Sequence, residues 1–148
     1  MYTLKSNALE CEFNTSEGCL YTARINNLLS DSAFIPDGSG CEFEIKFADG
    51  NTVSSKNLPI SEYAEKDGQL FFRFKEENHT TATMRFRVGK DGNTIEKQLV
   101  LTQSKPEVID CIFLENIGII NSRSSYSVPG GETDIDAFLF KSRSAVLY

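Results

Sequence analysis

The sequence predicts an all-β chain that folds as an immunoglobulin-like antiparallel β-sandwich with extra terminal strands or arms. Three observations support this fold class: apolar residues alternate with polar ones at a period of two, turn residues recur about every ten positions, and no stretch of about a dozen residues has a helical period. About eight or nine candidate strands are enough for two antiparallel sheets. At 148 residues, the chain (1–148) fits a single domain whose core needs no disulfides.

The N-terminal region, about residues 1–30, is predicted to form strands or an arm. LECEF at 9–13 alternates apolar residues with two glutamates, and LYTARI at 20–25 continues the alternation. INNLLSDSAF at 25–34 has room for one helical turn. This region therefore contributes at least two strands.

CEFEIKF at 41–47 predicts a strand with one face toward water. Its apolar residues point to one side, and its charged residues, Glu42, Glu44 and Lys46, point to the other. The turn at 48–51 contains Asp, Gly and Asn, which favour chain reversal.

Residues 69–103 show the clearest strand pattern. QLFFRFK at 69–75 and TATMRFRV at 81–88 alternate regularly, and a turn at 89–93 is bracketed by glycines. The return strand alternates through Ile95, Leu99 and Leu101. Lys97 is the one misfit on that apolar face.

The C-terminal region, about residues 105–148, is predicted to contain further strands and a tail. VIDCIFL at 108–114 and DIDAFLF at 134–140 are apolar enough for buried strands. The apolar stretch at 108–120 is interrupted by polar residues and is too short to span a bilayer, so no membrane association is expected.

Charge and the N-terminal sequence bear on partners and localisation. A net charge of −6 disfavours binding to nucleic acid. The segment after Met1 has no basic start, apolar run or cleavage site of a secretory signal. Met1 also fits a start that replaces a removed signal.

The sequence predicts that the protein is not an enzyme and has no cofactor. His79 is its only histidine and lies in a predicted turn, where a solvated side chain is expected. Cys11, Cys41 and Cys111 lie in strand-like sequence and are expected to be reduced core residues, with no zinc-ligand spacing.

A weak calcium site is the one metal hypothesis. Glu132, Asp134 and Asp136 place three carboxylates in register on a predicted strand. No glycine-bracketed calcium loop surrounds them, and a solvated strand face explains the same pattern. We therefore expect no metal site.

LFFRFKEENHTTATMRFRVGKDGNTIEKQLVLTQ at 70–103 resembles the second half of a BACON domain, an immunoglobulin-like module common in gut Bacteroidetes and their crAss-like phages. The matching pieces are Asn78, Thr80, Ala82-Thr83-Met84, Gly89 to Gly92 and Leu101-Thr102-Gln103. With CEFEIKF, the resemblance covers about residues 41–104, the BACON-like core. The chain departs from the family in having no tryptophan. The resemblance implies an immunoglobulin-like fold and a role as a carbohydrate binder or a spacer.

Two functions follow as hypotheses. The first is a structural protein that assembles with a larger shell protein or neighbouring subunits, such as an auxiliary or decorating capsid protein of a phage virion, made in the host cytoplasm. The alternative is a polysaccharide-binding module of a phage or cell-surface protein, extracellular if a signal peptide was removed. The candidate interaction surface comprises Phe71, Tyr126, Lys141, Arg143, Leu147 and Tyr148. The tail at 141–148 either docks on a neighbour or is a frayed terminus.

Overall fold

The computed structural model describes residues 1–15, 18–36, 38–116, 127–128 and 131–132, and the regular structure of this part is β-strand. Its strands are β1 (Tyr2–Lys5), β2 (Leu9–Asn14), β3 (Tyr21–Asn27), β4 (Ser32–Phe34), β5 (Cys41–Phe47), β6 (Thr52–Ser54), β7 (Ile60–Lys66), β8 (Gln69–Phe74), β9 (Thr80–Val88), β10 (Ile95–Gln103), β11 (Ile109–Asn116), β12 (Ser127–Val128) and β13 (Gly131–Glu132).

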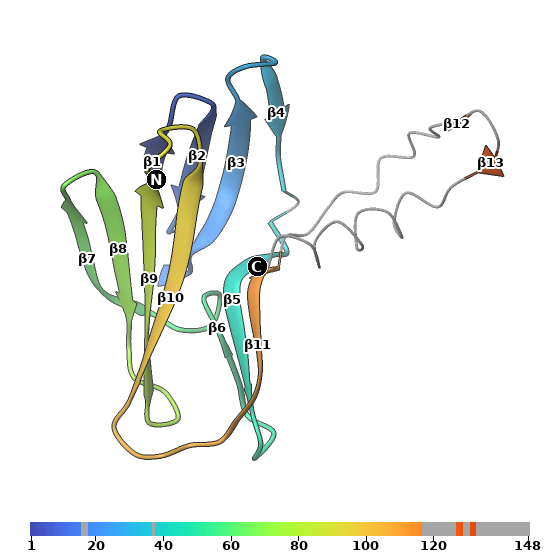
Figure 1. Ribbon diagram of the computed structural model, residues 1–148. Coiled ribbons are helices and arrows are strands. Elements are labelled where there is room, and N and C mark those ends of the chain that lie inside the picture. The colour runs from blue at the N-terminus through green and yellow to red at the C-terminus, as the bar shows by residue number, and fades with distance from the viewer. Residues whose placement is uncertain (16–17, 37, 117–126, 129–130, 133–148) are drawn as a thin grey trace.

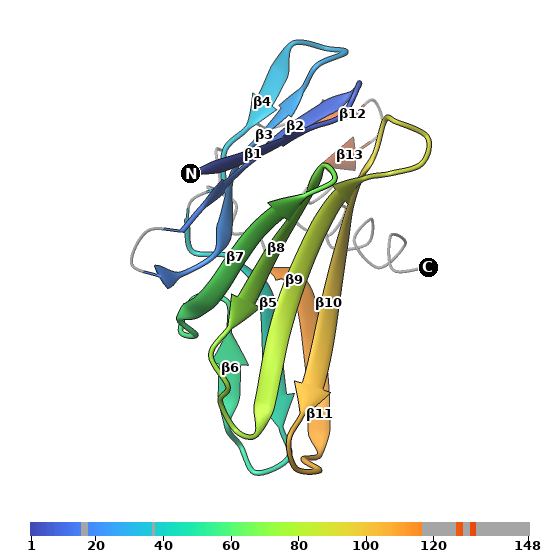
Figure 2. The same cartoon turned by 90° about the vertical axis from the view of Figure 1, so that its left-hand side faces the viewer.

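Antiparallel sheets form two packed layers (Figures 1 and 2). One layer is a four-stranded sheet in the order β10-β9-β8-β7. The other layer contains two smaller sheets, β1-β2-β3-β4 at one end and β11-β5-β6 at the other, and β12 pairs with β13 as a separate short hairpin. The predicted fold class, an all-β sandwich of antiparallel sheets, is confirmed.

The core lies between the layers and is rich in phenylalanine. The ring of Phe13 from β2 packs 4.3 Å from that of Phe86 in β9, and Phe43 from β5 lies 5.1 Å from Phe74 in β8. These four side chains are almost completely buried. The large sheet therefore packs against both small sheets, and the inward faces predicted for 69–75 and 81–88 are confirmed.

A buried serine joins the two small sheets. The amide of Leu20 donates to the carbonyl oxygen of Ser55 at 2.8 Å. The Ser55 hydroxyl donates to the carbonyl oxygen of Leu20 at 2.7 Å and accepts from the amide of Glu42 at 2.8 Å. Since Ser55 has no exposed surface, these buried bonds hold the start of β3 beside the start of β5.

The structure differs from the sequence-based predictions at two segments. Residues 25–34 contain no helical turn, because β3 and β4 pair through a tight turn in which Asp31 has a φ of 50°. The strand predicted at 108–114 exists as β11, but it is not buried: Ile112, Phe113 and Leu114 are each 44% exposed, since β11 lies at a sheet edge. The strand predicted at 134–140 lies outside the described residues.

Candidate functional site

A charged cluster lies between the layers of the sandwich. The ammonium of Lys97 on β10 contacts Glu42 Oε2 at 3.0 Å, Glu115 Oε1 at 2.6 Å and Thr22 Oγ1 at 3.1 Å. Thr22 also donates a 2.6 Å hydrogen bond to Glu42 Oε1. The Glu42 side chain is 2% exposed and that of Lys97 17%, so the cluster links β3, β5, β10 and β11 in a nearly dry environment.

The electrostatics of the cluster keep Lys97 charged. Burial by itself lowers the pKa of Lys97, but the carboxylates of Glu42 and Glu115 more than offset it, so the pKa is raised. The ammonium also lies 5.8 Å from the ring centroids of Phe13 and Phe86, within range of a cation–π attraction. All three strong donors of the ammonium therefore have partners.

A departure from regular strand geometry brings the carboxylate of Glu115 to Lys97. Leu114 faces the core side because it pairs with Phe43, so the next residue of a regular strand would face outward. Glu115 instead has a φ of 57°, and its carboxylate turns inward to Lys97. Two consecutive side chains of β11 thus point to the same side.

The position predicted for Glu42 is wrong. Alternation placed Glu42 on the face toward water, but Glu42 lies where β5 begins beside β3, and Thr22 and Lys97 cover it there. The sequence did indicate a buried acidic partner, because a lone lysine such as Lys97 on an otherwise apolar strand face needs a buried counter-charge. Sequence alone did not say which of the chain's 21 acidic residues supplies it.

The cluster has no room for a substrate. The hollow beside it, lined by Tyr21, Thr22, Cys41 and Glu42 among others, has a volume of about 10 Å³. That is about the space one water molecule needs. The cluster is therefore suited to holding β3, β5, β10 and β11 together.

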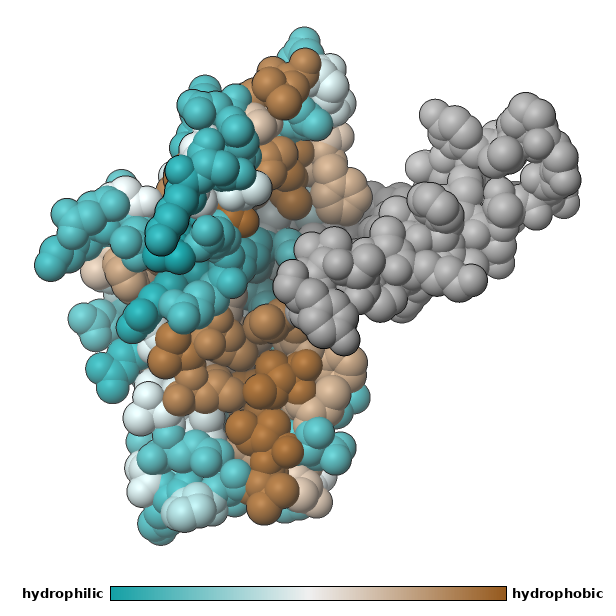
Figure 3. Space-filling view, viewed as in Figure 1, coloured by the Kyte–Doolittle hydropathy of each residue, from teal (hydrophilic) through white to brown (hydrophobic). Residues whose placement is uncertain are grey.

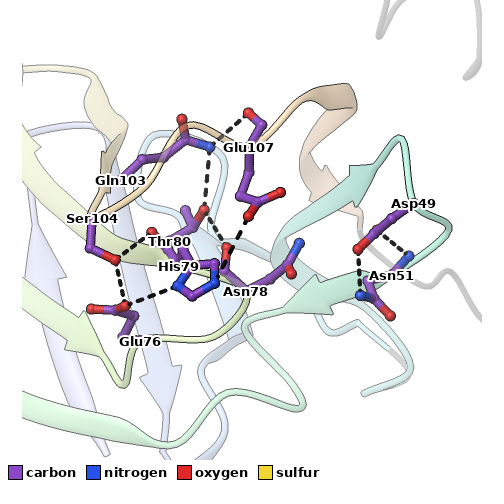
Figure 4. A network of polar contacts seen from close by, with 9 residues as sticks. All are labelled: Asp49, Asn51, Glu76, Asn78, His79, Thr80, Gln103, Ser104 and Glu107. Atoms are coloured by element: carbon purple, nitrogen blue, oxygen red, sulfur yellow. Dashed lines mark hydrogen bonds and ion pairs between the residues drawn. The ribbon is translucent and has the colours of Figure 1, made fainter.

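His79 lies in the turn before β9 and joins two loops (Figure 4). Its Nδ1 is 4.0 Å from Glu76 Oε1 and its Nε2 is 4.0 Å from Glu107 Oε1, while its carbonyl oxygen accepts a 2.8 Å hydrogen bond from the amide of Ser104. The hydroxyl of Ser104 donates to Glu76 at 2.7 Å rather than to the imidazole. No nucleophile, base and acid are aligned here as catalysis requires.

Within the described part of the chain, no group of three or more His, Cys, Asp or Glu side chains is arranged to hold a metal. Of the predicted calcium ligands, Asp134 and Asp136 lie outside the described residues, and only the backbone of Glu132 is described. Cys11, Cys41 and Cys111 are free thiols. Burial raises the pKa of Cys11 and of Cys41 to about 11, which keeps both thiols protonated at neutral pH.

Phe71 lies in a shallow groove on the outer face of the large sheet. The groove has a volume of about 400 Å³, and its walls include Arg73, Arg85, Thr81 and Thr83. The guanidinium of Arg85 lies 5.6 Å from the centroid of the Phe71 ring. The ring is half-buried, with one neighbour already stacked on it.

A group of exposed apolar side chains lies on the β3–β4 hairpin, with Leu28 and Leu29 in its turn, Phe34 at the end of β4 and Ile35 just after it. We call Leu28, Leu29, Phe34 and Ile35 the β3–β4 tip; Leu29 is 81% exposed and Ile35 59%. Figure 3 shows hydrophobic surface at this end of the molecule. The Asn27 side chain accepts hydrogen bonds from the amides of Leu29 and Ser30 at 3.0 and 3.2 Å, so the turn that displays Leu29 is held in place.

Of the predicted interaction residues, only Phe71 lies within the described residues. Tyr126, Lys141, Arg143, Leu147 and Tyr148 lie outside them. Sequence analysis did not select the β3–β4 tip, although the apolar pairs Leu28-Leu29 and Phe34-Ile35 flank a polar turn and were a visible signal.

Comparisons with known proteins name no relative. No protein family, no curated protein and no solved structure matches the chain. In the described residues, no helix is long and apolar enough to cross a membrane.

Proposed function

We propose that this protein is a non-catalytic structural component that binds neighbouring protein subunits through the β3–β4 tip. The observation behind this proposal is the exposure of four apolar side chains on the β3–β4 hairpin, two of them on a turn that hydrogen bonds to Asn27 hold in place. When a partner removes side chains such as Leu29 and Ile35 from water, the burial of their apolar surface stabilises the complex. A preordered turn loses little conformational entropy on binding, which favours a specific contact.

The partner that suits this tip has a shallow apolar pocket with a polar rim. Ser30, Asp31 and Ser32 lie between the two apolar pairs of the hairpin, and the Ser30 and Ser32 hydroxyls are 2.7 Å apart. Apolar centres with polar rims are typical of protein interfaces. The finer proposal, an auxiliary or decorating capsid protein of a phage virion, rests on the resemblance of residues 41–104 to BACON modules.

Co-sedimentation with structural particles from the source of the protein tests this function. We expect the wild-type chain to sediment with the particles at a fixed ratio, and the Leu29→Asp/Ile35→Asp variant to remain in the supernatant. Val108→Asp is the matched control, because Val108 is 71% exposed and lies at the start of β11, away from the tip. Equal sedimentation of all three proteins, or sedimentation of none, would reject the tip as the assembly contact.

A second candidate function is polysaccharide binding at the Phe71 groove. The groove combines an aromatic ring with arginine and threonine side chains, which supply the stacking surface and hydrogen bonds that sugars use. Affinity electrophoresis through gels containing a panel of bacterial and plant polysaccharides tests this candidate. Retardation that Phe71→Ala abolishes and Tyr63→Ala retains would support it, and unretarded migration in every gel would reject it.

A further inference from the structure

The sandwich is open along one side, between its two neighbouring edge strands. Within the described residues, β10 pairs only with β9, and β11 pairs only with β5, so each strand has one edge without a partner. Figure 1 shows these free edges on the same side of the molecule, in opposite layers. We call the space between them the β10–β11 seam, defined by Leu99 and Leu101 on β10 and by Ile112 and Leu114 on β11.

The β11 residues of the seam face the interior but are only partly covered, whereas Leu99 and Leu101 on β10 pack against the core. Ile112 pairs with Ile45, and Leu114 pairs with Phe43, so their side chains share the face of two completely buried residues. Ile112 and Leu114 are nevertheless 44% exposed. Figure 3 shows the result as a band of hydrophobic surface along this side of the sandwich.

Both ends of the seam are closed by contacts that join the layers. At one end, Lys97 on β10 binds Glu115 on β11 at 2.6 Å. At the other end, the Gln103 side chain donates to the carbonyl oxygen of Glu107 at 3.0 Å, in the loop that leads into β11 (Figure 4). The six steps along β10 from Lys97 to Gln103 correspond to about 20 Å, which is the length of a six- or seven-residue strand.

We propose that the β10–β11 seam is the docking site for residues 134–140 of the same chain, which add a strand to the free edge of β11. These residues lie outside the described part of the chain; their sequence, DIDAFLF, is apolar enough for a strand. In an extended segment, Ile135, Ala137 and Leu139 fall on one face and suit the apolar seam. Asp134, Asp136, Phe138 and Phe140 fall on the other face.

The connection from β11 has the length that this docking requires. Residues 117–126 connect Asn116 to the β12–β13 hairpin and span up to about 33 Å when extended. The antiparallel pairing of β12 with β13 reverses the chain just before residue 134. This tether keeps the segment at an effective concentration on the order of millimolar, which favours the same chain over a second copy.

Hydrogen exchange of the full chain, followed by mass spectrometry, tests the docking. We expect slow exchange in residues 134–140 and at the β11 amides that point away from β5. Leu139→Asp places a charge in the seam and should give fast exchange in both segments. Phe138→Asp is the matched control, since the neighbouring side chain faces away from the seam and its variant should keep wild-type protection.

Sedimentation velocity and thermal melting of the same samples complete the test. Protection that is present in the monomer and independent of protein concentration supports docking within one chain. If residues 134–140 of the wild-type protein exchange as fast as an unstructured peptide, the proposal is wrong. Protection that appears only in an oligomer would assign the seam to a second copy and also overturn it. If the Leu139→Asp variant shows no cooperative melt, it has not folded, and the exchange rate of residues 134–140 in the wild-type protein alone decides whether the proposal holds.

Discussion

Replacing Lys97 with methionine removes one charge from the interior while keeping most of the side-chain volume. The variant leaves Glu42, whose side chain is 2% exposed, without its counter-charge. Thr22 still donates a hydrogen bond to Glu42, whereas Glu115 is 39% exposed and can be hydrated. The free energy of unfolding should therefore fall because of Glu42 in particular.

The expected loss follows from the geometry of the pair. At 3.0 Å and an effective dielectric constant of about 20, two unit charges attract by roughly 5 kcal/mol. Removing Lys97 also removes its own desolvation penalty, so the net loss is smaller than this attraction. Deleting one partner of a buried pair commonly costs about 3 to 5 kcal/mol. Since Thr22 remains, we expect about 3 kcal/mol for Lys97→Met.

Urea unfolding at neutral pH measures this loss. The raised pKa of Lys97 means that its contribution is fully present below the unfolded value, about 10.4, and is lost only as pH rises through the higher folded value. The double variant Lys97→Met/Glu42→Gln removes both charges and should return to within about 1 kcal/mol of the wild type.

The neighbouring exposed ion pair provides the control. Arg87 contacts Glu96 at 2.6 Å, but both side chains are largely exposed, so Arg87→Met should cost less than about 1 kcal/mol. Unfolding of Lys97→Met at the wild-type urea concentration, or no recovery of stability when Glu42→Gln is added, would refute the stabilising role of the buried pair.

Three further predictions concern the core, the thiols and a turn. Phe72→Ala or Phe86→Ala, each at a side chain with no exposed surface, should lower the free energy of unfolding by about 3 to 5 kcal/mol; unchanged melting of both would contradict the packing. Burial raises the pKa of Cys11 and Cys41 to about 11, because the folded protein disfavours their thiolates. The free energy of unfolding should therefore be full below about pH 9 and fall toward pH 11. Constant urea midpoints across this range would exclude the effect. The Asp91 carboxylate accepts hydrogen bonds from the amides of Asn93 and Thr94, which lower the pKa of Asp91. Protection of these amides in hydrogen exchange should therefore persist above about pH 4 and weaken as the pH falls through the lower folded pKa. The Asp91→Ala variant should lose this protection.

The strands were predictable where one face of a sheet meets the core and the other meets water. In residues 69–75 and 81–88 the alternation decides the facing of every side chain, and the structure buries Phe72 and Phe86 as expected. The turn at 89–93 was equally readable, because glycines bracket it and Asp91 caps it with hydrogen bonds. Local sequence is sufficient to predict which way each side chain points when one face of the strand meets the core and the other meets water along its whole length.

The charged cluster and the exposure of β11 depend on how the sheets are placed, which a local pattern does not contain. Glu42 has the sequence context of a solvated residue and becomes buried only because β3 and β10 meet over the start of β5. Ile112 and Leu114 have the context of buried residues and become exposed because β11 is an edge strand. Both errors arise from tertiary neighbours, and Lys97 was the one residue whose local context signalled such a neighbour.

Lys97 also connects the stability of the interior to the seam. Its bond to Glu115 is the contact that holds β11 to β10 at one end, and the Gln103–Glu107 contact holds the other end. Between these contacts the seam depends on apolar cover alone. Lys97→Met should therefore speed hydrogen exchange in β11 more than in β8, which lies between β7 and β9. Equal acceleration in β8 and β11 would show that the cluster stabilises the sandwich as a whole rather than the β11 edge.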